Sequence, residues 1–587
     1  MAHVIDFEIF KEDWLCVIFD LGAKKETVIV NDREKLENYY NAHSKELFIG
    51  YNIRNYDQFI FKAILLGFDP KAVNDYIIVS KGKGYQFSRE FNRIPLCIFD
   101  IMPNPPIGLK TLEGFMGSDI RETTVPFDID RKLTKSELDE VIYYCRHDVE
   151  QTCEVLSRRM EELTSQIELV KMFDMPRADL GKSKAQLSAK ALGAKKPFRD
   201  REDEIKFSIP NTLKIRKYKF VVEWFEKCRE QAVEYAKEYG NEPALDELYS
   251  QKLECDIAGV PHIFAWGGIH GAIPNYCETG YFVNVDVASY YPSLMIEYGY
   301  ISRNIHDPEH YKDIYKTRLA YKAAKDKRAN PLKIVLNSTY GAMKDRFNPL
   351  YDPMNANNVC VAGQLLLLDL IEHLEGRFDI IQSNTDGILV KLRAANEAEA
   401  NREYQALDDA CYEWEQRSKM TLEFDEFRKV IQSNVNNYII VAADGSYKSK
   451  GGCVKKQNDL DYDLPIVNRA TVNYLVKGIP VEETVNNCHD LRDFQKIVKV
   501  SSKYAFATHN GVKLTEKTFR VFASNRNTDG KICKCKAEGA TEEKFANTPD
   551  CCFIDNSDVR GKEVPNYLDR NWYIELANKR ALEFLGK

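Results

Sequence analysis

The sequence predicts a multidomain α/β protein. Its 587 residues are enough for about four domains. A hydrophobic content of 44% and a charged content of 29% are typical of globular chains. Strand-like segments rich in β-branched and aromatic residues, such as 281–287, alternate with long helical patterns, such as 136–158 and 221–239.

The composition indicates in which cellular compartment we expect the protein and which classes of protein it fits. We find no run of about 18 apolar residues and therefore expect no membrane span. The N-terminus lacks the basic and apolar regions of a signal peptide. The 15 cysteines are odd in number and follow no framework spacing, which favours a reducing, cytoplasmic setting. The net charge of −7 does not by itself indicate a nucleic-acid binder, although only a binding channel needs to be basic.

Residues 1–165 are predicted to form one α/β unit with an acidic cluster. Four carboxylates and one phenol in this unit could converge: Asp6, Glu8, Asp57, Asp148 and Tyr144. Asp6 and Glu8 lie two apart on a strand, and Tyr144 and Asp148 lie four apart on a helix, so each pair shares a face. Such a cluster repels itself unless divalent metal neutralises it. We expect the neighbouring His147 on the helix surface.

The next two segments are less informative. Residues 166–255 are charged and largely helical, and we expect them to connect two larger parts. The pair Gly267-Gly268 follows Trp266 and permits a close approach of backbone or phosphate. A glycine-rich hairpin is the alternative interpretation.

The segment 281–295 is the most specific stretch of the chain. Period two places Asn284 and Asp286 on one face of its strand. A carboxylate at the end of a mostly apolar strand is costly unless it meets a cation or metal. The strand then breaks at Ala288-Ser289, and a helix begins near Pro292. The alternative is a capped strand end with a buried tyrosine pair.

Residues 311–333 carry eight Lys/Arg and two Asp, a local charge of +6 (8 − 2). Helical spacing places two sets of three residues on common faces: Arg318, Lys322 and Lys325, and, on a second helix that starts at Pro331, Lys333, Asn337 and Tyr340. A solvated pair of charged helices is the alternative.

The remaining segments are predicted as follows. Residues 378–392 form a hairpin, for which Asp386-Gly387 is a strong two-residue turn signal. A helix covers 397–419, and Tyr438 and Lys450 follow it. Four cysteines, Cys533, Cys535, Cys551 and Cys552, suggest zinc, but the adjacent pair suits tetrahedral chelation poorly.

Three of these segments resemble the motifs of family B DNA polymerases. Asp286-x-x-Ser289-x-Tyr291-Pro292-Ser293 resembles the first motif, and the segment Lys333 to Gly341 resembles the second. Residues 384–387 resemble the third, with Asn384 in place of an aspartate and Gly387 in place of a serine. The acidic residues of 1–148 resemble the three motifs of the proofreading DEDDy 3′–5′ exonuclease.

The resemblance implies an RNase H-like exonuclease domain followed by a right-hand polymerase with palm, fingers and thumb, of the bacteriophage type. The implied boundaries are exonuclease 1–165, connecting region 166–255, palm 256–300 and 351–445, fingers 301–350 and thumb 446–587. The implied function is template-directed DNA synthesis with proofreading. The implied partners are primer-template DNA, dNTPs and other phage replisome proteins, for a monomer in the host bacterial cytoplasm.

The resemblance also implies residue roles. Asp286 and Asp386 would bind two catalytic Mg²⁺ or Mn²⁺ ions, and Tyr291 would exclude a 2′-hydroxyl. The implied nucleotide-binding residues are Lys333, Asn337, Tyr340, Arg318 and Lys322, and the implied DNA-binding residues are Gly267, Gly268, Tyr438 and Lys450. In the exonuclease, Asp6, Glu8, Asp57 and Asp148 would hold two metals while Tyr144 orients the attacking water.

Two spacings restrict the subtype. Asp286 and Lys333 are 47 residues apart (333 − 286), and Gly341 and Asp386 are 45 apart (386 − 341). Neither interval has room for the insertions of protein-primed relatives, so we expect no terminal-protein primer. Two other functions stay open: a stand-alone 3′–5′ exonuclease with a decayed palm, and a non-catalytic DNA-binding scaffold.

Overall fold

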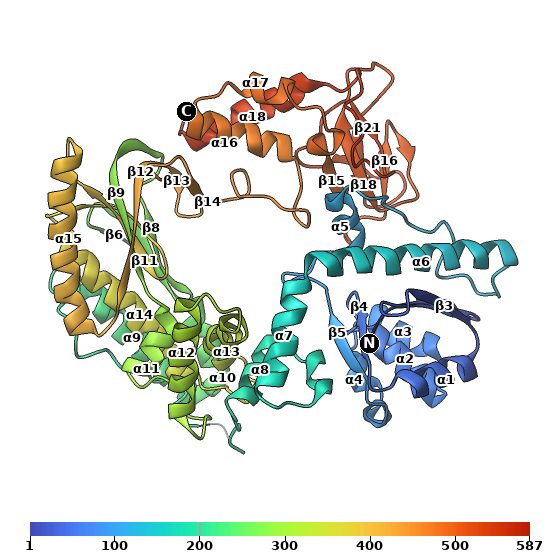
Figure 1. The fold of residues 1–587 in the computed structure, drawn as a ribbon, viewed down its shortest axis with the longest axis horizontal. Helices are drawn as coiled ribbons and strands as arrows, with labels where there is room; N and C mark the ends of the chain where they lie inside the picture. Colours follow the sequence, from blue (N-terminus) through green and yellow to red (C-terminus); the bar gives the residue numbers. More distant parts are fainter. Residues whose placement is uncertain (199–200) are drawn as a thin grey trace. The chain divides into compact units, whose positions relative to one another are not determined.

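The computed structural model describes residues 1–198 and 201–587 and has a mixed α/β architecture (Figure 1). The chain divides into two compact units. Unit 1 contains Met1–Lys182, Gln457–Ala470 and Pro480–Ala577. Unit 2 contains Ser183–Lys456, Thr471–Ile479 and Asn578–Lys587. This division is coarser than the six segments expected from the sequence, whose boundaries stay a prediction.

The N-terminal part of unit 1 is built on a five-stranded sheet of order β3-β2-β1-β4-β5. Its strands are β1 (Ala2–Ile9), β2 (Trp14–Asp20), β3 (Lys25–Val30), β4 (Leu47–Gly50) and β5 (Cys97–Asp100). The first three are antiparallel, and β4 and β5 run parallel to β1. The helices are α1 (Arg33–His43), α2 (Asp57–Leu66), α3 (Pro70–Ile78), α4 (Gly84–Phe87), α5 (Leu109–Met116), α6 (Lys135–Arg158) and α7 (Met160–Met172).

Local sequence signals explain where these helices begin and end. Helix α6 starts with a capping box in which Thr134 accepts a hydrogen bond from the Glu137 backbone and Glu137 reaches back to Thr134. Helix α2 ends at Gly67, whose φ of 79° favours glycine. Phenylalanine and isoleucine side chains from the sheet and from α2 form the core of this part.

The C-terminal part of unit 1 contains two small antiparallel sheets, of order β15-β18-β21 and β17-β16-β19-β20. Their strands are β15 (Lys496–Lys499), β16 (Phe506–His509), β17 (Val512–Lys513), β18 (Thr518–Ala523), β19 (Ile532–Cys535), β20 (Glu543–Lys544) and β21 (Cys552–Ile554). Helix α17 (Val481–Asn486) also belongs to unit 1, whereas α16 (Pro465–Lys477) and α18 (Arg570–Phe584) begin in unit 1 and end in unit 2.

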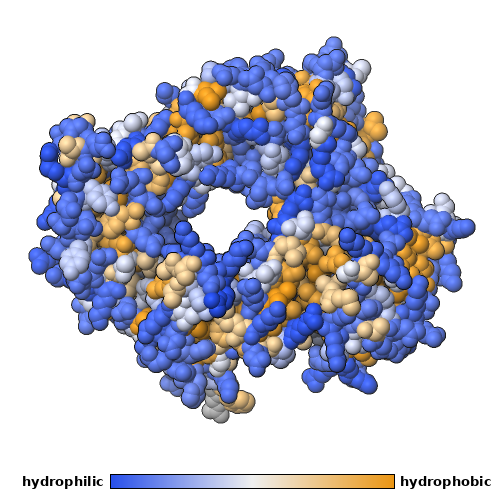
Figure 2. Space-filling view, viewed as in Figure 1, coloured by the Kyte–Doolittle hydropathy of each residue, from blue (hydrophilic) through white to orange (hydrophobic). Residues whose placement is uncertain are grey.

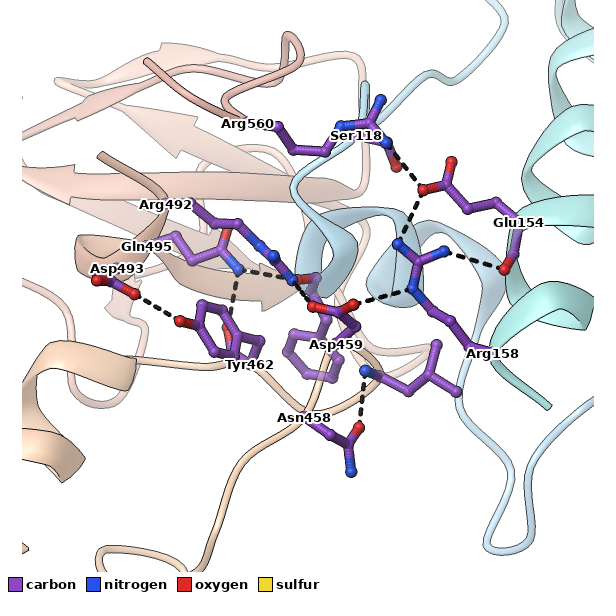
Figure 3. Close-up of polar contacts among 12 residues, drawn as sticks. Ser118, Glu154, Arg158, Asn458, Asp459, Tyr462, Arg492, Asp493, Gln495 and Arg560 are labelled. Atoms are coloured by element: carbon purple, nitrogen blue, oxygen red, sulfur yellow. Dashed lines mark hydrogen bonds and ion pairs between the residues drawn. The ribbon is translucent and has the colours of Figure 1, made fainter. Parts of the chain in front are cut away.

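A polar network joins the two parts of unit 1 (Figure 3). The Asp459 carboxylate accepts hydrogen bonds from Arg158 Nε at 3.2 Å and from Arg492 Nη2 at 2.7 Å. Glu154 pairs with Arg158 at 3.0 Å and with Arg560 at 2.8 Å. Asp459 thus links the end of α6 to residues more than 300 positions further along the chain.

Arg520 on β18 makes a second, fully buried link. Its side chain is 0% exposed and donates to the carbonyl oxygens of Ser118 at 2.7 Å and Ser557 at 2.5 Å. It also donates to Gln495 Oε1 at 3.1 Å. Burial lowers the pKa of Arg520 to about 10, which leaves the guanidinium charged at neutral pH. Arg520 Nη2 thus donates to the Ser118 carbonyl just beyond α5 and, at 3.3 Å, to the Gly114 carbonyl in the last turn of α5, where helices leave acceptors without partners.

We expect Arg520→Ala to destabilise unit 1 by about 3 kcal/mol or more, because several buried carbonyls lose a charged donor at once. Thermal and urea unfolding of the full chain measure the loss. Arg560→Ala is the matched control, since that side chain is 43% exposed and its ion pairs should contribute less than about 1 kcal/mol. Equal effects of the two substitutions would contradict the role given to Arg520.

Unit 2 is organised around a nine-stranded sheet of order β14-β13-β12-β9-β11-β10-β8-β7-β6. The strands are β6 (Lys252–Ile257), β7 (Val260–Ala265), β8 (Gly268–Ala272), β9 (Tyr276–Val287), β10 (Asp379–Ser383), β11 (Gly387–Leu392), β12 (Leu422–Asn434), β13 (Asn437–Val441) and β14 (Tyr447–Lys450). The helices are α8 (Lys184–Ala191), α9 (Lys219–Tyr239), α10 (Asn241–Ser250), α11 (Tyr290–Glu297), α12 (Pro308–Ala323), α13 (Ala329–Met343), α14 (Pro353–Leu374) and α15 (Glu397–Ser418). Helices α14 and α15 pack against the sheet.

Helix α14 is the apolar centre of unit 2. Among the described residues it alone has the length and composition needed to cross a membrane, and 94% of its most apolar stretch is buried within the protein. Such burial is typical of a core helix, although the sequence analysis did not single out this stretch. The face of the molecule shown in Figure 2 is mostly hydrophilic, with apolar residues in separate patches.

Candidate active sites

The N-terminal acidic cluster consists of the side chains of Asp6, Glu8, Asp57 and Asp148. Asp6 and Glu8 lie on β1, Asp57 is the first residue of α2, and Asp148 lies on α6. Ligand atoms of Asp6, Glu8 and Cys145 lie within 4.8 Å of one another. The charges of Asp148 on α6 and of Asp57 on α2 also interact with Asp6, so the structure places carboxylates from three elements near one another, as the sequence analysis expected.

Burial and mutual repulsion raise the pKa values of the carboxyl groups in this cluster. Burial and the charge of Asp148 raise the pKa of Asp6 to about 7. Burial and the charge of Asp6 raise the pKa values of Glu8 and Asp57 well above their usual range. Asp57 Oδ1 is buried and has no hydrogen-bond partner among the described residues. Hard oxygen donors that repel one another at close range fit divalent cations such as Mg²⁺ or Mn²⁺.

Lys110 on α5 is a member of this site that the sequence analysis missed. Its ammonium group donates to Asp148 Oδ1 and, at 3.1 Å, to Glu113 Oε1. It also lies 4.5 Å from the centre of the Tyr144 ring. Burial raises the pKa of Asp148 to about 6 even though Lys110 opposes the shift. Lys110 therefore fixes Asp148 and the phenol of Tyr144 relative to each other.

If the cluster cleaves DNA, we expect Lys110→Ala to slow 3′–5′ degradation about tenfold to hundredfold, because Asp148 and Tyr144 lose the group that orients them. Degradation of a labelled single strand measures the effect. Lys110→Arg should retain more activity than Lys110→Ala. The exposed Lys132→Ala is the control. An unchanged rate in Lys110→Ala would contradict a positioning role.

The position of His147 differs from the one expected from the sequence. The sequence analysis placed it on the helix surface, but it is only 8% exposed. Its Nε2 lies 3.2 Å from the Asp119 carbonyl oxygen and 3.7 Å from Glu113 Oε2. The segment after α5 covers this face of α6, so His147 packs inside unit 1.

A second site lies in unit 2, in a cavity of about 290 Å³. This central cavity is lined by Asn284, Asp286, Gln382, Asn384, Thr385, Asp386, Leu389, Tyr438, Ile440, Lys448 and Lys450. Asp286 on β9 and Asp386, just before β11, are 100 residues apart in sequence and share this cavity. The expected meeting of Asp286 and Asp386 is therefore observed.

The position of Asp286 depends on its neighbours in the sheet. Asn284 Nδ2 donates to Asp286 Oδ2 at 2.6 Å, from the same face of β9. Burial and the charge of Asp386 raise the pKa of Asp286 to about 6. Gly387 pairs with Asp286 across the strands, and a Cβ at Gly387 would lie 1.9 Å from Asp286 Oδ1. The glycine that departs from the family motif thus gives the Asp286 carboxylate its space.

The hairpin of β10 and β11 has a different turn from the one expected. The backbone N–H of Asn384 donates to the Gly387 carbonyl oxygen at 2.8 Å. Thr385 and Asp386 are therefore the two central residues of the turn. Neither has a positive φ, whereas an Asp-Gly turn of type I′ needs positive φ at both central positions. Asp386 therefore does not serve as the first residue of such a turn. Asn384 Oδ1 is buried without a partner among the described residues.

The glycine pair and two downstream residues lie near the same cavity. Gly268 opens β8 with a φ of 142°, and a Cβ there would lie 3.0 Å from Thr385 Cγ2. Gly267 precedes it in the turn between β7 and β8. Tyr438 on β13 pairs with Lys450 on β14, and both side chains line the cavity. The structure thus gathers four residues that the sequence analysis grouped as DNA-binding.

Helices α12 and α13 present the predicted basic residues only in part. Lys333 and Asn337 are exposed and Tyr340 is half-buried on one face of α13, as expected. On α12, Arg318 Nη1 donates to Ser289 Oγ at 3.3 Å, and Lys322 forms an exposed ion pair with Glu423 at 3.4 Å.

Two details of this pair of helices were predicted wrongly. Lys325 lies beyond the end of α12 with a φ of 54°, so it does not continue the face of Arg318 and Lys322. Helix α13 begins at Ala329 rather than at Pro331.

Tyr291 lies in the first turn of α11 and stacks on Tyr340 of α13, with ring centroids 4.4 Å apart. Tyr290 is buried, and its hydroxyl donates to the Gly363 carbonyl at 2.5 Å. The two adjacent tyrosines therefore have different surroundings: Tyr290 anchors α11 to α14, and Tyr291 is half-buried against α13.

The four C-terminal cysteines divide between two sheets. Cys533 and Cys535 lie on β19, whereas Cys552 begins β21 and Cys551 precedes it. Among the described residues, the groups with metal-ligand spacing do not include these cysteines.

Comparison with known proteins gives weak but consistent similarities. No protein-family model matches the sequence. Over 198 residues, 33% of the chain, it is 25% identical to DNA polymerase 1 of Saccharolobus solfataricus. Over 196 residues it is 24% identical to DNA polymerase 1 of Sulfurisphaera ohwakuensis. The matches cover 20% and 21% of those proteins, so the chain spans about a fifth of the length of the curated relatives that it matches.

A solved structure, that of the family B DNA polymerase from Pyrobaculum calidifontis, aligns with 99% of this chain and 77% of its own. The sequence identity is 14% and the TM-score 0.41.

Proposed function

We propose that this chain is a DNA polymerase of family B that extends a primer in the central cavity and proofreads in the N-terminal acidic cluster. One observation carries the proposal. Asp286 and Asp386 are 100 residues apart in sequence and line the same cavity. Lys448, Lys450 and Tyr438 line it with them. The similarity to two archaeal DNA polymerases supports the same activity.

The residues of the central cavity suit nucleotidyl transfer. Two divalent cations held by Asp286 and Asp386 would activate the primer hydroxyl and neutralise the phosphate charge. Asn284 holds Asp286 in place through its 2.6 Å hydrogen bond. Lys448 and Lys450 place positive charge at the wall of the cavity, where a DNA backbone would need it. In this proposal Lys333 on α13, with Arg318 and Lys322 on α12, binds the triphosphate, and Asn337 and Tyr340 contact the nucleotide.

In the N-terminal acidic cluster, Asp6, Glu8, Asp57 and Asp148 would hold the cations of a 3′–5′ exonuclease. Tyr144, whose ring lies under the Lys110 ammonium, would orient the attacking water. The cluster and the central cavity belong to different units, so we propose two separate activities. The bacteriophage origin, the cytoplasmic location, the monomeric state and the absence of protein priming stay predictions from the sequence.

A primer-extension assay tests the proposal. The full chain is incubated with a labelled primer-template and Mg²⁺, with and without dNTPs. Lengthening with dNTPs supports the polymerase, and shortening without dNTPs supports the exonuclease. Shortening alone would favour a stand-alone exonuclease, and a gel shift without either reaction would favour a binding scaffold.

We expect Tyr291→Ala to weaken discrimination against ribonucleotides at least about tenfold, or ~1.4 kcal/mol. The ring of Tyr291 is fixed against Tyr340 and would fill the space of a 2′-hydroxyl. Competition between dNTP and rNTP in single-turnover incorporation measures the ratio. Tyr291→Phe retains the ring and should retain discrimination. An unchanged ratio of dNTP to rNTP incorporation in Tyr291→Ala would contradict the proposal that the Tyr291 ring excludes a 2′-hydroxyl.

A further inference from the structure

A second group of metal-ligand side chains lies apart from both proposed active sites. It consists of His3 on β1, His43 at the end of α1 and Glu46 in the turn before β4. Their ligand atoms lie within 4.8 Å of one another. We propose that this triad binds a transition-metal dication of the zinc class.

The distances within the triad suit one shared ion. Glu46 Oε2 lies 2.6 Å from His3 Nε2 and 3.3 Å from His43 Nδ1. Zinc lies about 2.0–2.2 Å from imidazole nitrogen and carboxylate oxygen ligands. In a tetrahedral site, two such ligand atoms are therefore ~3.3 Å from each other. The His43–Glu46 pair already has that separation, and the His3–Glu46 pair needs to lengthen by less than about 1 Å to reach it. The fourth position is left for water.

The surroundings orient the ligands. His3 is 0% exposed, and its other ring nitrogen, Nδ1, lies 2.9 Å from the Tyr39 hydroxyl. A metal-bound imidazole commonly makes such a hydrogen bond with its second nitrogen, which fixes the tautomer and the ring direction. Asp20, the cross-strand partner of His3, places a carboxylate oxygen 3.9 Å from the same Nδ1. The side chains of His43 and Glu46 are 25% and 19% exposed, so an ion can reach the site from solvent.

The ligand chemistry separates this site from the acidic cluster. Two imidazoles and one carboxylate suit zinc, cobalt or nickel, whereas four carboxylates suit magnesium or manganese. The metal would tie β1 to the turn between α1 and β4. Since β1 also carries Asp6 and Glu8, the ion would stabilise the strand on which the acidic cluster depends.

Cobalt titration of the full chain tests the proposal. Mg²⁺ in large excess occupies the carboxylate sites, and Co²⁺ is then added as the optical probe. We expect one equivalent of Co²⁺ to give the visible absorption of a four-coordinate site, without a sulfur-to-cobalt charge-transfer band. Zn²⁺ should displace it. A charge-transfer band would instead assign the ion to one of the free cysteines, and would overturn the proposal.

Single substitutions of the proposed ligands test whether Co²⁺ binds at the triad of His3, His43 and Glu46. His43→Gln and Glu46→Gln replace partly exposed side chains and should each weaken Co²⁺ binding at least tenfold. His489→Gln, at an exposed histidine, is the matched control and should bind like the wild type. Zn²⁺ should raise the unfolding temperature of the wild type and of His489→Gln more than that of His43→Gln. Absence of Co²⁺ binding, or equal binding in His43→Gln, would overturn the proposal.

Discussion

Asp386→Asn should slow primer extension by several orders of magnitude while the chain still binds primer-template DNA. The substitution keeps the size of the side chain and removes a carboxylate from the cavity that Asp286 shares. In the proposed mechanism this charge holds cations that supply several kcal/mol to the transition state. Each 1.36 kcal/mol corresponds to about tenfold in rate. Single-turnover extension measures the rate, and a gel shift measures binding.

Asn384→Ala is the matched control for Asp386→Asn. Asn384 lines the same cavity and lies in the same turn, but it carries no charge, so its loss should cost about tenfold at most. If Asp386 acted only as a central residue of the Thr385-Asp386 turn, asparagine would replace it well, because Asn and Asp are both favoured in turns. Near wild-type extension by Asp386→Asn would therefore exclude a catalytic role for this carboxylate.

The double substitution Asp6→Ala and Glu8→Ala should abolish 3′–5′ degradation of single-stranded DNA, with a loss of at least about a thousandfold, or ~4 kcal/mol. Both carboxylates lie on β1 and belong to the acidic cluster. Extension should persist, because Asp286 and Asp386 belong to unit 2. Time courses on a labelled single strand, and on a primer-template with dNTPs, measure both activities.

Glu12→Ala provides the control for the double variant. Glu12 is an exposed acid just beyond the end of β1 and should leave both activities unchanged. Degradation by the double variant at the parental rate would place the nuclease site elsewhere. Loss of extension together with degradation would show that the substitutions disturb the fold of the whole chain, which unfolding curves would reveal.

Regular spacing within one element was the most reliable guide from sequence to structure. Lys333, Asn337 and Tyr340 share a face of α13 because helical periodicity is local. Asn284 and Asp286 share a face of β9 for the same reason. The prediction for Lys325 was wrong because α12 ends at Ala323, and residue spacing does not encode where a charged helix stops.

Contacts between distant elements were the part that the sequence could not supply. Lys110 reaches Asp148 across 38 residues, and a single lysine carries no pattern that announces such a partner. His147 was placed on the surface because its burial depends on Glu113 and Asp119, which lie outside its own helix. The departures at Asn384 and Gly387 were visible in the sequence, but the space that Gly387 gives Asp286 became clear only from strand pairing.

The link between Arg520 and Ser118 has a consequence for synthesis on the ribosome. The two residues are 402 positions apart, and nearly all of unit 2 is translated between them. At about 5–20 residues per second, that interval takes roughly 20–80 s. During this time the nascent N-terminal part has α5 without the strand that later covers it. Chaperones that hold exposed apolar surface should therefore associate with nascent chains of this length, and release them once β18 has left the exit tunnel.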